Sequence, residues 1–123
     1  MIRLFALLAL TACAAAPPVP DAPVSYRLVS IDGTAFAARA TISFVGLGQF
    51  SGSAPCNSYS GELLEPLPAF TSSRLTSTEM ACQDLPAEMV FFAALATMNR
   101  ADITGPRLRL SDPAGRSMDF VQF

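Results

Sequence analysis

Three cysteines are the residues of this chain best suited to covalent chemistry. Cys13 follows an apolar N-terminal segment, whereas Cys56 and Cys82 lie well inside the remaining sequence. In an exported protein an even pair of cysteines usually forms a disulfide, and joining Cys56 to Cys82 would be worth about 3.5 kcal/mol in the loop-entropy account. The alternatives are a redox site, which more typically has Cys-x-x-Cys spacing, and half of a metal site. We favour the structural disulfide.

Acid–base chemistry has few candidates. The chain has no histidine, and all eight of its basic residues are arginine, so the commonest general base and metal ligand is missing. Glu62 with Glu65, or Glu79 with Asp84, would supply paired carboxylates, but sequence spacing alone does not bring either pair together. A serine nucleophile would lack histidine or lysine as its base. We therefore expect no catalytic residues and no enzymatic activity.

Metal, phosphate and nucleic-acid sites also lack their signatures. Asp102, Asp112 and Asp119 are expected close to turns, without the ligand spacing of a calcium-binding loop. The glycines of residues 46–48 are expected in a hairpin rather than before a helix, so they do not form a phosphate loop. The formal net charge of −2, without a basic cluster, argues against nucleic acid. We expect no metal and no cofactor.

The N-terminal segment has the pattern of an export signal. Residues 1–12 hold ten hydrophobic residues and a single charge, Arg3, and are too short to span a bilayer. The junction Leu10-Thr11-Ala12-Cys13 resembles the bacterial lipobox. This resemblance implies cleavage before Cys13 and its modification with lipid chains such as palmitate, which would anchor the protein to a membrane. The alternative is an ordinary cleaved signal.

Residues 13–23 connect this anchor to the rest of the chain. Ala14 stands where an inner-membrane retention Asp would be, and by resemblance this favours the outer membrane, facing the periplasm. Four prolines follow within ten residues, and such a run favours an extended conformation of about 3.1 Å per residue. We predict a tether of roughly 30 Å that precedes a single domain over residues 24–123. The alternative is a disordered leader with no spacing role.

From residue 24 onward, apolar and polar residues mostly alternate, which is typical of half-buried strands. Asp32-Gly33 is a turn dipeptide. Residues 107–120 are expected to form a final hairpin around a turn that contains Pro113 and Gly115. The other predicted strands lie at residues 26–31, around 40–44, at 49–53, at 56–61 and around 70–75.

One segment departs from this alternation. Residues 86–98 are predicted to form a helix with a proline in its first turn and the acidic Asp84 and Glu88 near its positive end. The helix is apolar on nearly all sides, so we expect it to be buried. Without Lys or Arg along its edge, a membrane-surface role is disfavoured. The predicted fold class is α+β, with a small, curled antiparallel sheet and one packed helix.

Two segments resemble a known family. Residues 48–61 read Gly-Gln-Phe-Ser-Gly-Ser-Ala-Pro-Cys-Asn-Ser-Tyr-Ser-Gly, and residues 75–82 read Leu-Thr-Ser-Thr-Glu-Met-Ala-Cys. These segments are similar to the signature of META domains, the family of the heat-inducible, HslJ-type bacterial lipoproteins. The similarity extends over residues 24–123 in the family's order. Pro55 stands where many members have Gly, and Tyr26 stands where Trp is common.

The resemblance implies a barrel-like domain associated with envelope or heat stress and with drug tolerance. It brings no catalytic residues. Asn57, Tyr59 and Gly61 match core positions of the family motif. We expect Asn57 to close a turn, Tyr59 to be a buried ring with its hydroxyl satisfied, and Gly61 to mark a bulge or a positive φ. Ligand contact is the alternative for all three.

The sequence therefore predicts a non-catalytic, lipid-anchored envelope protein. It would contribute to stress tolerance by binding an envelope protein or a small ligand. The alternative is a periplasmic inhibitor of a hydrolase such as lysozyme or a protease.

Overall fold

The protein, seen here as a computed structural model, is described over residues 24–46 and 48–123. The predicted signal peptide, the lipidated Cys13 and the proline-rich tether lie outside these residues. The described elements are β1 (Val24–Ile31), β2 (Thr34–Ala35), β3 (Thr41–Val45), β4 (Gln49–Ser53), β5 (Ser58–Leu63), β6 (Ser72–Ser77), α1 (Leu85–Leu95), β7 (Arg100–Thr104), β8 (Arg107–Ser111) and β9 (Ser117–Gln122).

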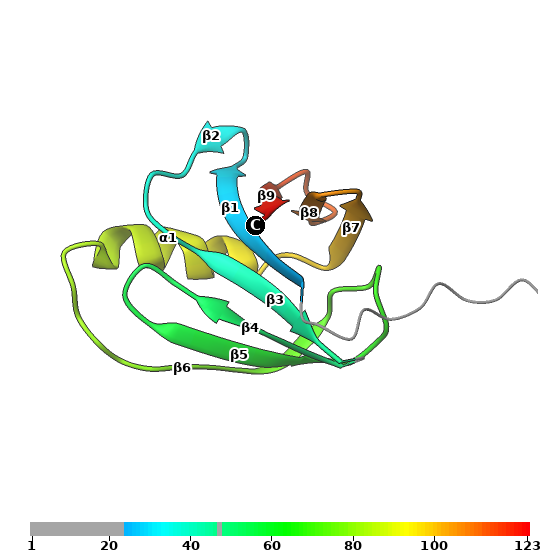
Figure 1. The fold of residues 1–123 in the computed structure, drawn as a ribbon, viewed down its shortest axis with the longest axis horizontal. Coiled ribbons are helices and arrows are strands. Elements are labelled where there is room, and N and C mark those ends of the chain that lie inside the picture. The colour runs from blue at the N-terminus through cyan, green and yellow to red at the C-terminus, as the bar shows by residue number, and fades with distance from the viewer. Residues whose placement is uncertain (1–23, 47) are drawn as a thin grey trace, which may run out of the picture.

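The strands form one antiparallel sheet in the order β6-β5-β4-β3-β1-β9-β8-β7, with the short β2 beside β1. The sheet curls strongly, and α1 lies across its concave side (Figure 1). The segment before β6 pairs with the start of β7 at the other edge, because the Phe70 N–H donates to the Asn99 carbonyl at 2.8 Å and the Ala101 N–H donates to the Pro68 carbonyl at 2.8 Å. The predicted α+β class with a curled, barrel-like sheet is confirmed.

The core lies between the sheet and the helix. The side chains of Phe50, Phe70 and Phe91 are almost completely buried, and the rings of Phe50 and Phe70 lie 5.1 Å apart. Burying a side chain of this size contributes about 1.5–3 kcal/mol. This aromatic cluster fixes α1 against the sheet.

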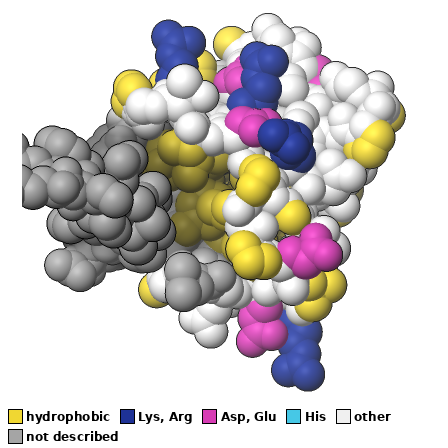
Figure 2. All heavy atoms as spheres, turned by 90° about the vertical axis from the view of Figure 1, so that its right-hand side faces the viewer, with side chains coloured by type: hydrophobic (Ala, Val, Ile, Leu, Met, Phe, Trp, Pro, Cys, Tyr) yellow, Lys and Arg dark blue, Asp and Glu magenta, His cyan; other side chains and the backbone are white. Residues whose placement is uncertain are grey.

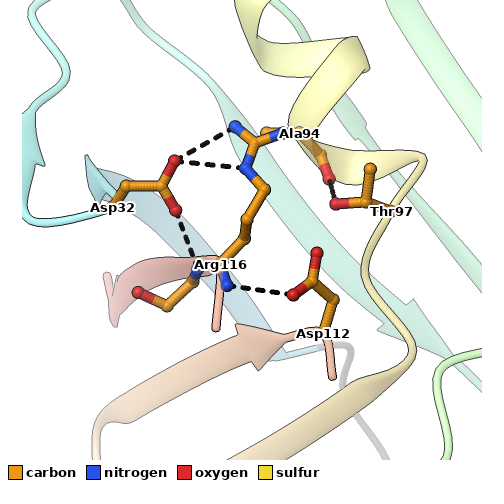
Figure 3. A network of polar contacts seen from close by, with 6 residues as sticks. Asp32, Ala94, Thr97, Asp112 and Arg116 are labelled. Atoms are coloured by element: carbon orange, nitrogen blue, oxygen red, sulfur yellow. Dashed lines mark hydrogen bonds and ion pairs between the residues drawn. The ribbon is translucent and has the colours of Figure 1, made fainter. Parts of the chain in front are cut away.

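The helix differs from its prediction in length and in burial. It ends at Leu95 rather than at Met98, and the Thr97 hydroxyl donates to the Ala94 carbonyl at 3.0 Å in the tightened turn that follows (Figure 3). Phe91, Ala94 and Leu95 face the core. Because the curled sheet covers only that side, the opposite side of the helix is exposed. The expectation of a buried helix therefore holds for one side of α1 and was wrong for the other.

The C-terminal part is a three-stranded meander rather than a hairpin. β7 was missed because its sequence, Arg-Ala-Asp-Ile-Thr, gives no clear apolar face. Asp102 lies inside β7 and Asp119 inside β9, so the expectation that both lie near turns was wrong. Each pairs with an arginine, Asp102 with Arg100 at 2.9 Å and Asp119 with Arg109 at 2.7 Å.

Two predicted strands are shifted along the chain. β5 begins at Ser58 rather than at Cys56, because the residues before it form a loop. β6 begins at Ser72, and Phe70 enters the core before the strand starts.

The predicted turn at Asp32-Gly33 is present, and both residues have positive φ. The Asp32 carboxylate accepts the Ser117 N–H at 3.0 Å and the guanidinium of Arg116 at 3.1 Å (Figure 3). The backbone hydrogen bond from Ser117 and the nearby guanidinium lower the pKa of Asp32. The turn after β1 is thereby fixed to the start of β9.

Candidate functional site

The residues of the family-like motif meet where the loop before β5, the segment after β6 and helix α1 come together. Cys56 and Cys82 are joined by a disulfide, with their Cα atoms 5.6 Å apart. This bond connects the loop before β5 to the segment that leads into α1.

Asn57 links all three parts of the chain. Its side-chain amide donates to a Glu88 carboxylate oxygen at 2.6 Å and to the Met80 carbonyl at 3.0 Å. Its side-chain oxygen accepts the Met80 N–H at 2.6 Å and the Thr78 hydroxyl at 2.9 Å. Every donor and acceptor site of the amide is therefore occupied. Asn57 was expected to close a local turn, and instead it joins segments more than twenty residues away.

Glu88 completes this network from the helix. It is buried, and its second carboxylate oxygen accepts the Cys56 N–H at 2.7 Å. Sequence reasoning placed Glu88 only as an acid near the helix N-terminus and missed its contacts. The available signal was that Glu88 is the one charged residue in a helix that is otherwise apolar.

Tyr59 is a buried ring that links β5 to β3. Its hydroxyl donates to the Thr41 carbonyl at 2.5 Å, and burial raises its pKa well above the ordinary value. Gly52 makes this hydrogen bond possible, because a Cβ at that position would collide with the Thr41 carbonyl oxygen and would lie 2.8 Å from the Tyr59 hydroxyl. Sequence reasoning did not single out Gly52.

Gly61 has a packing role. The register between β5 and β6 shifts between Ser60 and Glu62, so Gly61 lies at a bulge, and its φ is not positive. A Cβ here would collide with the Phe50 ring, reaching 2.8 Å from one of its Cε atoms. The absence of a side chain at position 61 therefore lets this ring pack against the strand.

Beside the Asn57 network, the surface forms a hollow of about 520 Å³ between α1 and the segment after β6. We call it the Met80 groove. Its apolar lining comes from Met80, Leu85, Met89 and Phe92, and its polar lining includes Thr78 and Glu79. Met80 and Met89 are 66% and 68% exposed, so both side chains are open to a partner.

The groove is acidic. Glu79 lines it, and Asp84 directly precedes its residue Leu85. No basic residue occurs between residues 75 and 99. The face of the molecule shown in Figure 2 differs, because basic and acidic side chains lie close together there.

Within residues 24–46 and 48–123, no group of three or more Cys, Asp or Glu residues is placed to hold a metal ion. No helix in the same part of the chain is long and apolar enough to cross a membrane.

Comparisons with known proteins agree with this architecture. The model of one family, the META domain, matches residues 22–123. The NMR structure of a protein from Burkholderia xenovorans is similar, with 22% sequence identity and a TM-score of 0.64, and the match covers 94% of this chain and 99% of that one. At this identity the similarity concerns the fold alone. No curated protein matches the chain.

Proposed function

The chain belongs to the META domain family, and from this membership we propose that it is a non-catalytic, lipid-anchored protein of the bacterial cell envelope that acts by binding. On this proposal the domain is tethered through Cys13 to the outer membrane and faces the periplasm. It contributes to tolerance of envelope or heat stress and of drugs.

The observation that carries the binding role is the position of Met80. A buried amide, Asn57, uses three of its four hydrogen bonds on the segment from Thr78 to Met80, and two of these hold the Met80 backbone. The Met80 side chain is nevertheless 66% exposed. An exposed apolar side chain on a backbone held this firmly is preorganised for contact with a partner.

The state of the motif residues supports a role without catalysis. Both oxygens of the Glu88 carboxylate accept hydrogen bonds, and Cys56 and Cys82 are joined in a disulfide. The Tyr59 hydroxyl donates to a carbonyl, and its pKa is raised by burial. These groups therefore maintain the fold and are not poised as nucleophile, acid or base.

The proposal is tested first at the anchor. The full chain and its Cys13→Ser variant are expressed in bacteria supplied with labelled palmitate, and their envelopes are fractionated. We expect label and outer-membrane association for the unaltered chain, and neither for the variant. Labelling of the variant, or an unlabelled chain recovered from the soluble periplasm, would contradict a lipid anchor on Cys13.

Inhibition of a periplasmic hydrolase is the competing function, because a rigid, disulfide-braced groove would also suit a tight enzyme complex. It requires a stoichiometric effect. Lysozyme is the probe, assayed with and without an equimolar amount of the protein. We expect an unchanged rate, whereas a clear loss of rate at this ratio would favour the inhibitor.

A further inference from the structure

The Met80 groove brings several large apolar side chains together at one place on the surface. Met80, Leu85 and Met89 are all exposed, and together with the half-buried Phe92 they line one hollow. In Figure 1 the segment after β6 runs up to the first turn of α1. Apolar exposure concentrated in one hollow is typical of an interaction site, whereas single exposed side chains are ordinary.

The two walls of the groove differ in how they are built. One wall is helix α1, held against the core by Phe91 and Leu95. The other wall is an irregular segment, held by the Cys56–Cys82 disulfide and by the hydrogen bonds from Asn57. The backbone on both sides is therefore fixed, while the unbranched methionine side chains can adapt to the shape of a partner.

The charge around the groove determines what can enter it. Glu79 is exposed in the lining, and Asp84 is exposed with a side chain that makes no capping hydrogen bond to the helix. With no basic residue between positions 75 and 99, neither carboxylate has a neighbour in sequence to neutralise it. Positively charged groups are therefore attracted to the rim of the groove, and anionic surfaces are repelled.

We propose that the Met80 groove binds a segment of a partner protein that places apolar side chains between Met80 and Met89 and lysine or arginine side chains beside Glu79 and Asp84. The inference rests on the proposed binding function and names its site and its class of partner. A second copy of this chain is disfavoured, because a symmetric contact would bring two acidic rims together. An anionic lipid surface is disfavoured for the same electrostatic reason.

The test uses the methyl groups of methionine as reporters in the full chain, kept in solution with a non-ionic detergent. The protein is labelled with carbon-13 at its methionine methyl groups and titrated with a synthetic peptide of leucine and lysine in amphipathic helical order. We expect the signals of Met80 and Met89 to shift. The signals of Met98 and Met118, which are buried in the core, should stay in place.

Two comparisons test whether the peptide must be positively charged and whether it binds in the groove. A peptide with glutamate in place of lysine should bind at least about tenfold more weakly, since two attractive pairs become repulsive. The Met89→Gln variant should weaken the shift at Met80. Leu64→Gln is the control, because Leu64 has a similar exposure of 63% but does not line the groove. This variant should leave the shift at Met80 unchanged.

Several outcomes would overturn the inference. Equal binding of the two peptides, or no shift at Met80 and Met89, would exclude a cationic, apolar segment as the partner. Shifts that follow protein concentration without peptide would indicate a second copy, and shifts produced by vesicles of anionic lipid but not by peptide would indicate a membrane. These outcomes concern the groove alone, whereas the palmitate experiment tests the anchor, so the two failures are distinguishable.

Discussion

Asn57 shows how one side chain can organise a surface. It lies 7% exposed between three segments, and its amide makes four hydrogen bonds, two of them to the backbone of Met80. The amide also keeps the buried carboxylate of Glu88 satisfied. A buried network of this kind is stabilising only while every member has its partner. We therefore expect the loss of one member to destabilise the whole hydrogen-bond network.

Replacing Asn57 with alanine tests this network. The variant leaves the Met80 N–H and one Glu88 oxygen without their partners, so we expect the free energy of unfolding to fall by about 2–4 kcal/mol. Urea denaturation measures the loss. Ser60→Ala is the control, because it removes a hydroxyl that is hydrogen-bonded but exposed, and it should change stability by less than about 0.5 kcal/mol. Similar values for the two variants would show that Asn57 is not structural.

The two tyrosines determine how the stability of the protein should change at alkaline pH. Burial raises the pKa of both Tyr26 and Tyr59 above the ordinary value of 10.0. Above about pH 10 the unfolded chain therefore releases phenolic protons more readily than the folded chain, and stability falls as the pH rises. Below that pH these two groups leave stability unchanged.

An alkaline titration followed by phenolate absorbance and by circular dichroism measures this. We expect phenolate to appear together with the loss of folded structure. Tyrosine ionisation that is complete while the circular dichroism remains native would show that neither ring is protected by the fold.

Among the structural elements, β4 and β5 depend on glycine at their contact with the core. At Gly61 a Cβ would collide with the Phe50 ring, and at Gly52 it would collide with the Thr41 carbonyl oxygen that accepts the Tyr59 hydrogen bond. Gly61 thus lets an aromatic ring pack against its strand, and Gly52 lets the backbone at Thr41 approach closely. Their role is steric, since neither has a positive φ.

Gly61→Ala should lower the free energy of unfolding by about 1–3 kcal/mol, because the Phe50 ring must leave its position. Gly48→Ala is the matched control, since a Cβ at position 48 would meet nothing within 4 Å and the φ is not positive. We expect this control to stay within about 0.5 kcal/mol of the unaltered protein. Thermal or urea unfolding of both variants distinguishes them, and equal losses would contradict the role assigned to Phe50.

The elements that could be predicted were those that depend only on the residues within them. The turn at Asp32-Gly33 follows from residues that tolerate positive φ, and β4 follows from the alternation of residues 49–53. The limits of α1 and the presence of β7 could not be predicted in the same way. They depend on how far the curled sheet extends and on the pairing of β7 with β8, which are not local properties.

The same distinction holds for the candidate site. The pairing of Cys56 with Cys82 followed from counting cysteines, and the burial of Tyr59 followed from its residue type. The contact between Asn57 and Glu88 joins residues separated by 31 positions, and sequence spacing gives no measure of it. The Met80 groove could not be foreseen for the same reason, because its two walls meet only in the folded chain.

At the scale of the whole molecule, the lipid anchor is predicted from the sequence, and the Met80 groove is seen in the structure. The charge of −2 is unevenly distributed along the chain, because residues 75–99 contain acidic residues and no basic ones. A tether of roughly 30 Å would let this acidic, apolar region reach a partner while the lipid stays in the membrane. We propose that the protein binds its partner through this region.

Site-specific photo-crosslinking in intact cells tests that claim most directly. In the full chain, a photoreactive amino acid replaces Met89, which lies in the groove. In a control protein it replaces Leu64, which has similar exposure but lies outside the groove. After irradiation, the crosslinked products are purified and the partner's contact segment is identified by mass spectrometry. We predict a discrete adduct from position 89, with an apolar segment flanked by lysine or arginine, and none of that kind from position 64. No adduct from position 89, or the same adducts from both positions, would contradict the account.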